Sequence, residues 1–123
     1  MFGQDKGNRI LYAEEDSFLQ ELIGLSLQLE GFTVLHAADG REAQTVYTKE
    51  KPDLIILGLT MQVLDGFGFL NWLRQEIKSS TPALVLTSIE QPGIEDRIMA
   101  AGANAVVFKP VKMPDLVKQI KKL

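Results

Sequence analysis

Two hydrophobic patterns alternate along this chain. Short runs rich in Val, Ile and Leu stand at residues 10–13, 33–36, 54–57, 83–87 and 105–108. Several of these runs are apolar throughout, which is typical of parallel strands that helices cover on both faces. A buried helix segment has a similar pattern, but runs of four or five residues between Gly, Pro, Asp and Ser favour strands.

The segments between the apolar runs have the periodicity of helices. It predicts helices over residues 17–30, 40–51, 67–77, 95–101 and 114–123. On the first of these, four large apolar side chains form one stripe with the spacing i, i+4, i+7 and i+11: Phe18, Leu22, Leu25 and Leu29. Leu19 and Ile23 flank this stripe. Asp16 or Ser17 can cap the start of the helix, and Gly31 follows its end.

The alternation amounts to five βα units. Strands joined by helical crossovers are parallel, so the pattern predicts an α/β, doubly wound fold with helices on both faces of a central sheet. Residues 1–8 are polar and rich in glycine and read as a disordered lead-in, and residues 9–123 form a single domain. In such sheets ligands bind beyond the carboxyl ends of the strands, so these ends are where chemistry is expected.

The composition excludes several kinds of functional site. The 123 residues include no cysteine and one histidine, which excludes a disulfide framework, a zinc site with cysteine ligands, an iron–sulfur cluster and a thiol nucleophile. The net charge of −3 disfavours non-specific binding to nucleic acid or an anionic membrane. No apolar stretch approaches the roughly 20 residues of a membrane span, and the start lacks the apolar region of a secretory signal. We therefore expect a cytoplasmic domain that binds neither nucleic acid nor membrane.

Polar residues follow the predicted strands. An acidic run stands at residues 14–16, Thr87 and Ser88 end the fourth strand, and Lys109 follows the fifth. Carboxylates are ligands that Mg²⁺ prefers, and a lysine beside a hydroxyl suits a phosphoryl oxygen. Each group also has an ordinary interpretation, since acids and hydroxyls cap helices and a lone lysine is usually a solvated charge. Their coincidence at one edge of the sheet favours a site.

This pattern resembles the receiver domain of two-component response regulators, over nearly the whole chain from Arg9 to Leu123. The strings that carry the resemblance lie at residues 10–16, 52–57, 64–67, 85–88, 101–103 and 108–110. The resemblance implies a flavodoxin-like, CheY-like three-layer sandwich whose five parallel strands lie in the order 2-1-3-4-5. It also implies a Mg²⁺ site on an acidic pair, a phosphoacceptor Asp at the end of the third strand, and a Ser/Thr and a Lys that bind the phosphoryl group. The bond before Pro110 resembles one that receivers usually hold in cis.

Carried over by position, the acidic pair falls on Glu14 and Glu15, the hydroxyl on Thr87 and the phosphoryl-binding lysine on Lys109. The phosphoacceptor falls on Gly58, which has no side chain and cannot form an acyl phosphate. We therefore expect no catalytic residue in this chain and no enzymatic activity.

Further positions depart from the family. The second acid is Glu15 where receivers mostly have Asp, the usual proline of the third loop is Gln62, and the switch aromatic is Val106. The extra methylene of Glu15 displaces its carboxylate, and Gly58 supplies no carboxylate at all. Because Mg²⁺ tolerates geometric error badly, we expect the Mg²⁺ site to be weak or absent and no cofactor to be required. We further expect Lys109 to pair with Glu14 or Glu15, so that this edge of the sheet is stable without metal. These departures occur together with Gly58. They favour a degenerate receiver over a competent receiver in which only the acceptor Asp has changed to Gly.

The most economical interpretation is a degenerate receiver, or pseudo-receiver, that acts in two-component signalling through protein–protein interaction. One alternative is an active receiver with an unusual phosphoacceptor, either Thr60 or Glu15, although an alcohol is a poor acceptor without a general base. Another is a phosphate- or nucleotide-binding enzyme on the same fold. The chain lacks a P-loop and a Gly-x-Gly-x-x-Gly motif, and the acidic run at residues 14–16 repels phosphate.

A partner would be a histidine kinase or an output domain or protein. The loop after the third strand is unusually apolar, and Met61, Val63 and Trp72 are its candidates for exposure, with Val106 as a further contact. A homodimer through the fourth helix, fifth strand and fifth helix is a second expectation. The lysines of the last helix form either a solvated face or a contact for an acidic partner.

Overall fold

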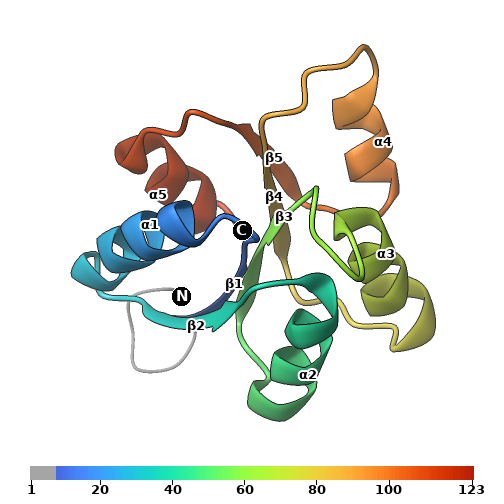
Figure 1. The fold of residues 1–123 in the computed structure, drawn as a ribbon, viewed down its shortest axis with the longest axis horizontal. Helices are drawn as coiled ribbons and strands as arrows, with labels where there is room; N and C mark the ends of the chain where they lie inside the picture. Colours follow the sequence, from blue (N-terminus) through green and yellow to red (C-terminus); the bar gives the residue numbers. More distant parts are fainter. Residues whose placement is uncertain (1–7) are drawn as a thin grey trace.

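The computed structural model describes residues 8–123, so the expected lead-in lies outside the described residues except for Asn8. Five parallel strands form one sheet in the order β2-β1-β3-β4-β5, which confirms the prediction (Figure 1). The strands are β1 (Arg9–Ala13), β2 (Thr33–Ala37), β3 (Leu54–Gly58), β4 (Ala83–Thr87) and β5 (Ala105–Phe108). Their carboxyl ends carry the residues that the sequence marks as a site.

Helices cover both faces of the sheet, with α1 and α5 on one face and α2, α3 and α4 on the other (Figure 1). Their bounds are α1 (Ser17–Leu29), α2 (Gly40–Glu50), α3 (Gly66–Asn71), α4 (Ile94–Ala100) and α5 (Met113–Lys121). The helix expected over residues 67–77 is instead two pieces, because α3 passes into a π-helical turn, η1 (Trp72–Glu76). There the amide of Ile77 donates to the carbonyl of Trp72 at 3.0 Å. Within residues 8–123, no helix combines the length and apolar character that a bilayer crossing requires.

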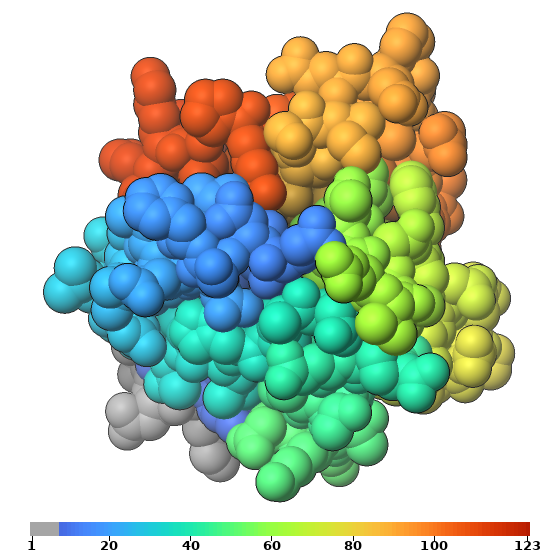
Figure 2. Space-filling view, in the orientation of Figure 1, coloured from blue at the N-terminus to red at the C-terminus, as the bar shows by residue number. Residues whose placement is uncertain are grey.

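The regular apolar stripe of α1 does not face the sheet, and another side of the helix is buried instead. The stripe side chains are exposed, at 71% for Phe18, 50% for Leu22, 54% for Leu25 and 88% for Leu29. The face toward the sheet is formed by Ile23, Gly24 and Leu27. Helix α1 is apolar on more than one side, so periodicity alone does not identify the packed side. Figure 2 shows the blue segment that contains α1 on the front surface of the molecule.

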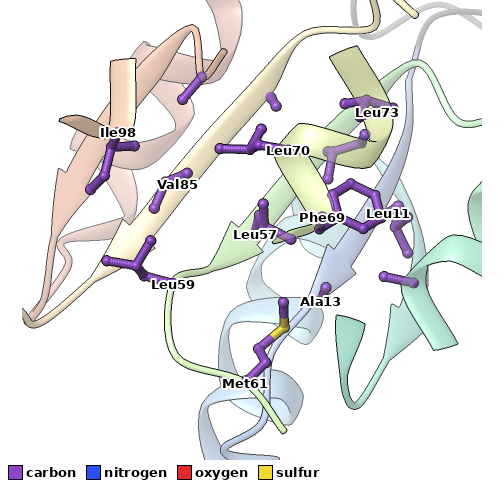
Figure 3. Close-up of a cluster of buried hydrophobic side chains, with 14 of the residues drawn as sticks. Leu11, Ala13, Leu57, Leu59, Met61, Phe69, Leu70, Leu73, Val85 and Ile98 are labelled. Carbon is purple, nitrogen blue, oxygen red and sulfur yellow. The ribbon is translucent and has the colours of Figure 1, made fainter. Parts of the chain in front are cut away.

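The core consists of two layers, one on each face of the sheet. Side chains alternate along each strand, so in β1 Leu11 and Ala13 join one layer while Ile10 and Tyr12 join the other. Figure 3 shows the layer beneath α2, α3 and α4, where Leu57 of β3 lies near Phe69 and Leu70 of α3. Strands β3 and β4 are buried along their whole length. The sheet is therefore a rigid platform for the residues at its carboxyl edge.

Candidate functional site

The site lies where β1, β3, β4 and β5 end. Glu14 follows β1 and Lys109 follows β5, and their side chains form an ion pair with 3.1 Å between Nζ of Lys109 and Oε1 of Glu14. The Glu14 side chain is 4% exposed and that of Lys109 is 21% exposed, so water screens the pair only weakly. The expected pairing of Lys109 thus occurs with Glu14. Glu15, the other candidate, is exposed.

Tyr12 is a member of the site that the sequence analysis missed. Its hydroxyl donates to Oε1 of Glu14 at 3.2 Å, from within the buried part of β1. Burial, together with the adjacent Glu14 carboxylate, raises the pKa of Tyr12 far above its ordinary value. The signal was present in the sequence, because residues two apart on a strand point to the same side. A tyrosine two residues before the first acid can therefore reach its carboxylate.

The rest of the acidic run organises the chain locally. Oε2 of Glu14 accepts the amide of Asp16 at 3.2 Å. The Asp16 carboxylate accepts the amides of Phe18 at 2.9 Å and Leu19 at 3.1 Å, which caps α1 as predicted. The Gln20 side chain donates to the carbonyl of Glu14 at 3.3 Å. Both carboxylate oxygens of Glu14 therefore have partners from this chain.

Gly58 ends β3 beside Glu14, and its place is buried. A Cβ added at Gly58 would lie 3.5 Å from the carbonyl oxygen of Ala13, 3.7 Å from Cγ of Met61 and 3.9 Å from Oε2 of Glu14. These are ordinary van der Waals distances, so the backbone does not require glycine here. A carboxylate at this position would approach that of Glu14. The position therefore has room for a Cβ, and it lacks a nucleophile.

Thr87 and Lys109 are joined through the backbone, as the amide of Lys109 donates to the carbonyl of Thr87 at 2.8 Å. The buried hydroxyl of Thr87 accepts the amide of Ile89 at 3.1 Å, so it fixes the loop after β4. This bond lies within the loop and is not a helix cap, because α4 begins at Ile94 and Gly93 stands at its N-cap without a side-chain hydrogen bond. The Lys109-Pro110 bond is cis, as the resemblance implied. Thr60, the alternative acceptor, is exposed.

The residues at this edge do not fit a Mg²⁺ ion. Glu14 is engaged by Tyr12, Lys109 and the amide of Asp16, and Gly58 offers no side-chain oxygen. Over residues 8–123, no three or more His, Asp or Glu side chains are grouped so that they could hold a metal. Lys109 supplies the positive charge that a cation would bring to Glu14.

The apolar loop after β3 is mostly folded inward. Met61 is 7% exposed and packs in the core layer near Ala13, so its expected exposure is wrong (Figure 3). Trp72 is half-buried, and its ring meets that of Tyr47 edge-on at 5.9 Å between centroids. Val106 is also half-buried. Of the candidate contacts in this loop, Val63 is the exposed one, at 75%.

Comparison with known families and proteins agrees with this architecture. The family model for the response regulator receiver domain matches residues 10–121. The chain is 34% identical over 117 residues to the transcriptional regulatory protein PrrA of Mycobacterium tuberculosis, covering 94% of this chain and 49% of that protein. It is 30% identical over 118 residues to the DNA-binding dual master transcriptional regulator RpaA of Synechocystis, covering 94% and 48%. The chain thus spans about half the length of these curated relatives.

Solved structures share the fold over nearly the whole chain. The chemotaxis response regulator CheY4 of Vibrio cholerae superposes with a TM-score of 0.85 at 30% identity, covering 93% of this chain and 96% of that one. The receiver domain of the Francisella response regulator 1452 superposes with a TM-score of 0.88 and covers 94% of both chains. Its identity of 23% supports a likeness of fold alone.

Proposed function

This chain belongs to the response regulator receiver domain family, and from that premise we propose that it is a pseudo-receiver that signals without being phosphorylated. Its role is to present a fixed receiver surface to another signalling protein, either a histidine kinase or an output domain. It works without Mg²⁺ and catalyses no reaction. Several relatives of the chain are transcriptional regulators, which supports an output domain that regulates transcription as the partner.

The observation that carries the proposal is the absence of a nucleophile at Gly58. Phosphorylation of a receiver requires a carboxylate oxygen to attack phosphorus while the donor's leaving group departs with its electron pair. Gly58 has no such oxygen, and the nearest carboxylate, Glu14, already accepts from Tyr12 and Lys109. An attack by Glu14 would first have to break both interactions. The alternative acceptors, Thr60 and Glu15, are exposed, whereas Glu14 of the ion pair is buried.

The Glu14–Lys109 pair supports the proposal that the receiver surface is fixed, that is, that the domain has a single stable state. In this chain the lysine that the family assigns to the phosphoryl group is held by a glutamate instead. Thr87 is likewise held in the loop after β4. With both groups engaged inside the domain, the surface offered to a partner does not depend on a bound phosphoryl group.

The test is intact-mass measurement after incubation with acetyl phosphate and Mg²⁺. We expect the wild-type chain to keep its mass, whereas a phosphoryl adduct would overturn the proposal. Peptide mapping of such an adduct to Thr60 or Glu15 would establish the active-receiver alternative. Gly58→Asp restores the carboxylate and is expected to gain an adduct. Gly58→Ala adds the same Cβ without an acceptor and should stay unmodified, which controls for a change in shape.

A further inference from the structure

Most of the large hydrophobic side chains that are exposed within residues 8–123 lie in one stripe on α1. Its four side chains, with the exposed fractions given above, follow one another at intervals of four, three and four residues. Taking about 200 Å² for a fully exposed residue of this size, they present on the order of 500 Å². A patch of this size on a small domain marks an interaction surface.

The chain's own packing does not account for this stripe. Ile23 and Leu27 already seat α1 against the sheet. The outward face is almost free of charge, since Glu21 is the one charged residue between Ser17 and Leu29. Helices that face only water usually carry polar and charged residues on that side. The outward face of α1 therefore has the composition of a helix that packs against another helix.

We propose that α1 is the interface of a homodimer, in which the α1 helices of two copies pack antiparallel around a two-fold axis between Leu22 and Leu25. The four-three-four spacing is that of the seam between two helices of a coiled coil. About such an axis, Phe18 of each copy meets Leu29 of the other, and Leu22 meets Leu25. Every position of the stripe thus faces an apolar side chain.

The area and the flanking residues suit this occupant. A stable interface buries roughly 800 Å² on each partner, with smaller values for weak dimers, and the stripe supplies more than half of that. Glu21 and Gln28 flank the stripe, and the antiparallel arrangement sets the charged Glu21 beside the neutral Gln28 of the other copy. The helix is already formed in the monomer, so little ordering is needed on association.

A groove continues the surface toward α5. It has a volume of about 560 Å³, and its walls include Leu19 and Leu22 of α1, and Pro110 and Met113 near the start of α5. This apolar groove lies beside the seam and can accept side chains from the rim of the second copy. It extends the buried area beyond the four stripe residues.

The exposed acids at the ends of α1 give the dimer a distinctive salt dependence. Asp16 and Glu30 lie at opposite ends of the helix and are both exposed. The antiparallel arrangement brings Asp16 of one copy near Glu30 of the other, where like charges repel and salt screens the repulsion. Added salt should therefore strengthen the dimer. A basic partner helix seated on the same stripe would instead be weakened by salt.

Sedimentation velocity of the full chain tests the proposal, over a range of concentrations and in 0.1 and 0.5 M NaCl. We expect a concentration-dependent dimer that is stronger at the higher salt. Leu25→Glu should weaken dimerisation at least tenfold without unfolding the domain, since Leu25 is exposed. Met99→Glu is the matched control, because Met99 is an exposed apolar residue of α4, on the face expected from the sequence to dimerise.

The results of these sedimentation experiments distinguish a dimer through α1 from a dimer through α4 and from a basic partner helix. A dimer that Leu25→Glu disrupts and Met99→Glu leaves intact supports the α1 interface. The reverse pattern places the interface at α4 and overturns the proposal, as does a monomer at every concentration or a dimer weakened by salt.

The orientation of the two helices is tested by mixing Glu21→Cys and Gln28→Cys proteins with a short bis-maleimide, since the chain has no other cysteine. Mixed cross-links should exceed those of Glu21→Cys alone, because the two residues 21 are offset by about 7.5 Å along the helix axis, whereas residue 21 and residue 28 of the other copy are offset by about 3 Å. Equal yields would contradict the antiparallel arrangement.

The dimer does not depend on the pseudo-receiver function. A monomeric chain that stays unphosphorylated would overturn the dimer alone. A phosphorylated dimer would overturn the proposed function alone.

Discussion

Lys109 reaches Glu14 across the ends of β3 and β4, because β1 and β5 are separated by these two strands in the sheet. The ion pair closes the carboxyl edge beside Gly58, where receivers hold their acceptor. Glycine at this position leaves Lys109 with Glu14 as its anionic partner, since a carboxylate there would compete for the same ammonium group. The Glu14–Lys109 ion pair is thus favoured by the absence of an acceptor carboxylate at Gly58.

The contributions of Glu14 and Lys109 to the free energy of unfolding should depend on each other. Lys109→Met leaves a buried carboxylate without its cation and should lower the free energy of unfolding by about 1–3 kcal/mol. Glu14→Gln removes the charge, so the double variant should lose about 1–2 kcal/mol less than the sum of the single variants. Urea denaturation of the four proteins measures this coupling. Lys112→Met, at an exposed lysine nearby, is the control and should change stability by no more than about 0.5 kcal/mol. Strict additivity would show that Lys109 and Glu14 do not interact.

Tyr12 should make the domain sensitive to alkali. Burial, with the adjacent Glu14 carboxylate, raises the pKa of Tyr12 in the folded state, whereas in the unfolded chain it is about 10. The stabilising contribution of the neutral hydroxyl is therefore complete below about pH 10 and is lost as the pH rises beyond it. Between about pH 10 and 12, the free energy of unfolding should fall more steeply in wild type than in Tyr12→Phe, by about 1.4 kcal/mol per pH unit. Parallel pH profiles from chemical denaturation would contradict this account of Tyr12.

Val63 should carry removable backbone strain. Its φ is 69°, a left-handed conformation that β-branched residues avoid, and its side chain is exposed. Val63→Gly should stabilise the domain by about 0.5–1 kcal/mol, because the strain relieved exceeds the entropy that glycine loses on folding. Val63→Ala trims the side chain but keeps a Cβ, and should gain less. Thermal unfolding of the three proteins measures the difference, and an unchanged or lower stability of Val63→Gly would argue against strain at this residue.

The fold was predictable because its signals are local and repeated. Apolar runs such as residues 54–57 and 83–87 are short and bounded by turn residues, which favours strands buried on both faces, and helical crossovers between such strands make the sheet parallel. The π-helical turn after α3 was not predictable, since hydrophobic spacing does not distinguish it from an α-helix. The buried face of α1 was not predictable either, because both Ile23 and Leu25 are apolar, and the sheet decides which is covered.

Glu14, Thr87 and Lys109 were predictable as members of the site, whereas Tyr12 and its contact with Glu14 were not predicted. The order of the strands brings Glu14 and Lys109 to one edge, and their pairing followed from charge. The roles of Tyr12 and Met61 depend on where side chains point after folding. Tyr12 turns its hydroxyl toward Glu14, and Met61 turns inward from its loop. The strand period could have placed Tyr12 on the side of Glu14, whereas no pattern in the sequence specifies that Met61 turns inward.

Fluorine NMR with beryllofluoride and Mg²⁺ tests the central claim most directly, because beryllofluoride occupies the place of a phosphoryl group on an acceptor carboxylate. We predict that wild type shows only the resonances of free fluoroberyllates and an unchanged amide spectrum. Gly58→Asp, measured in parallel, reports whether the rest of the pocket can still hold the ligand. A bound fluorine resonance in wild type, with amide shifts at Gly58 and Thr87, would contradict the account.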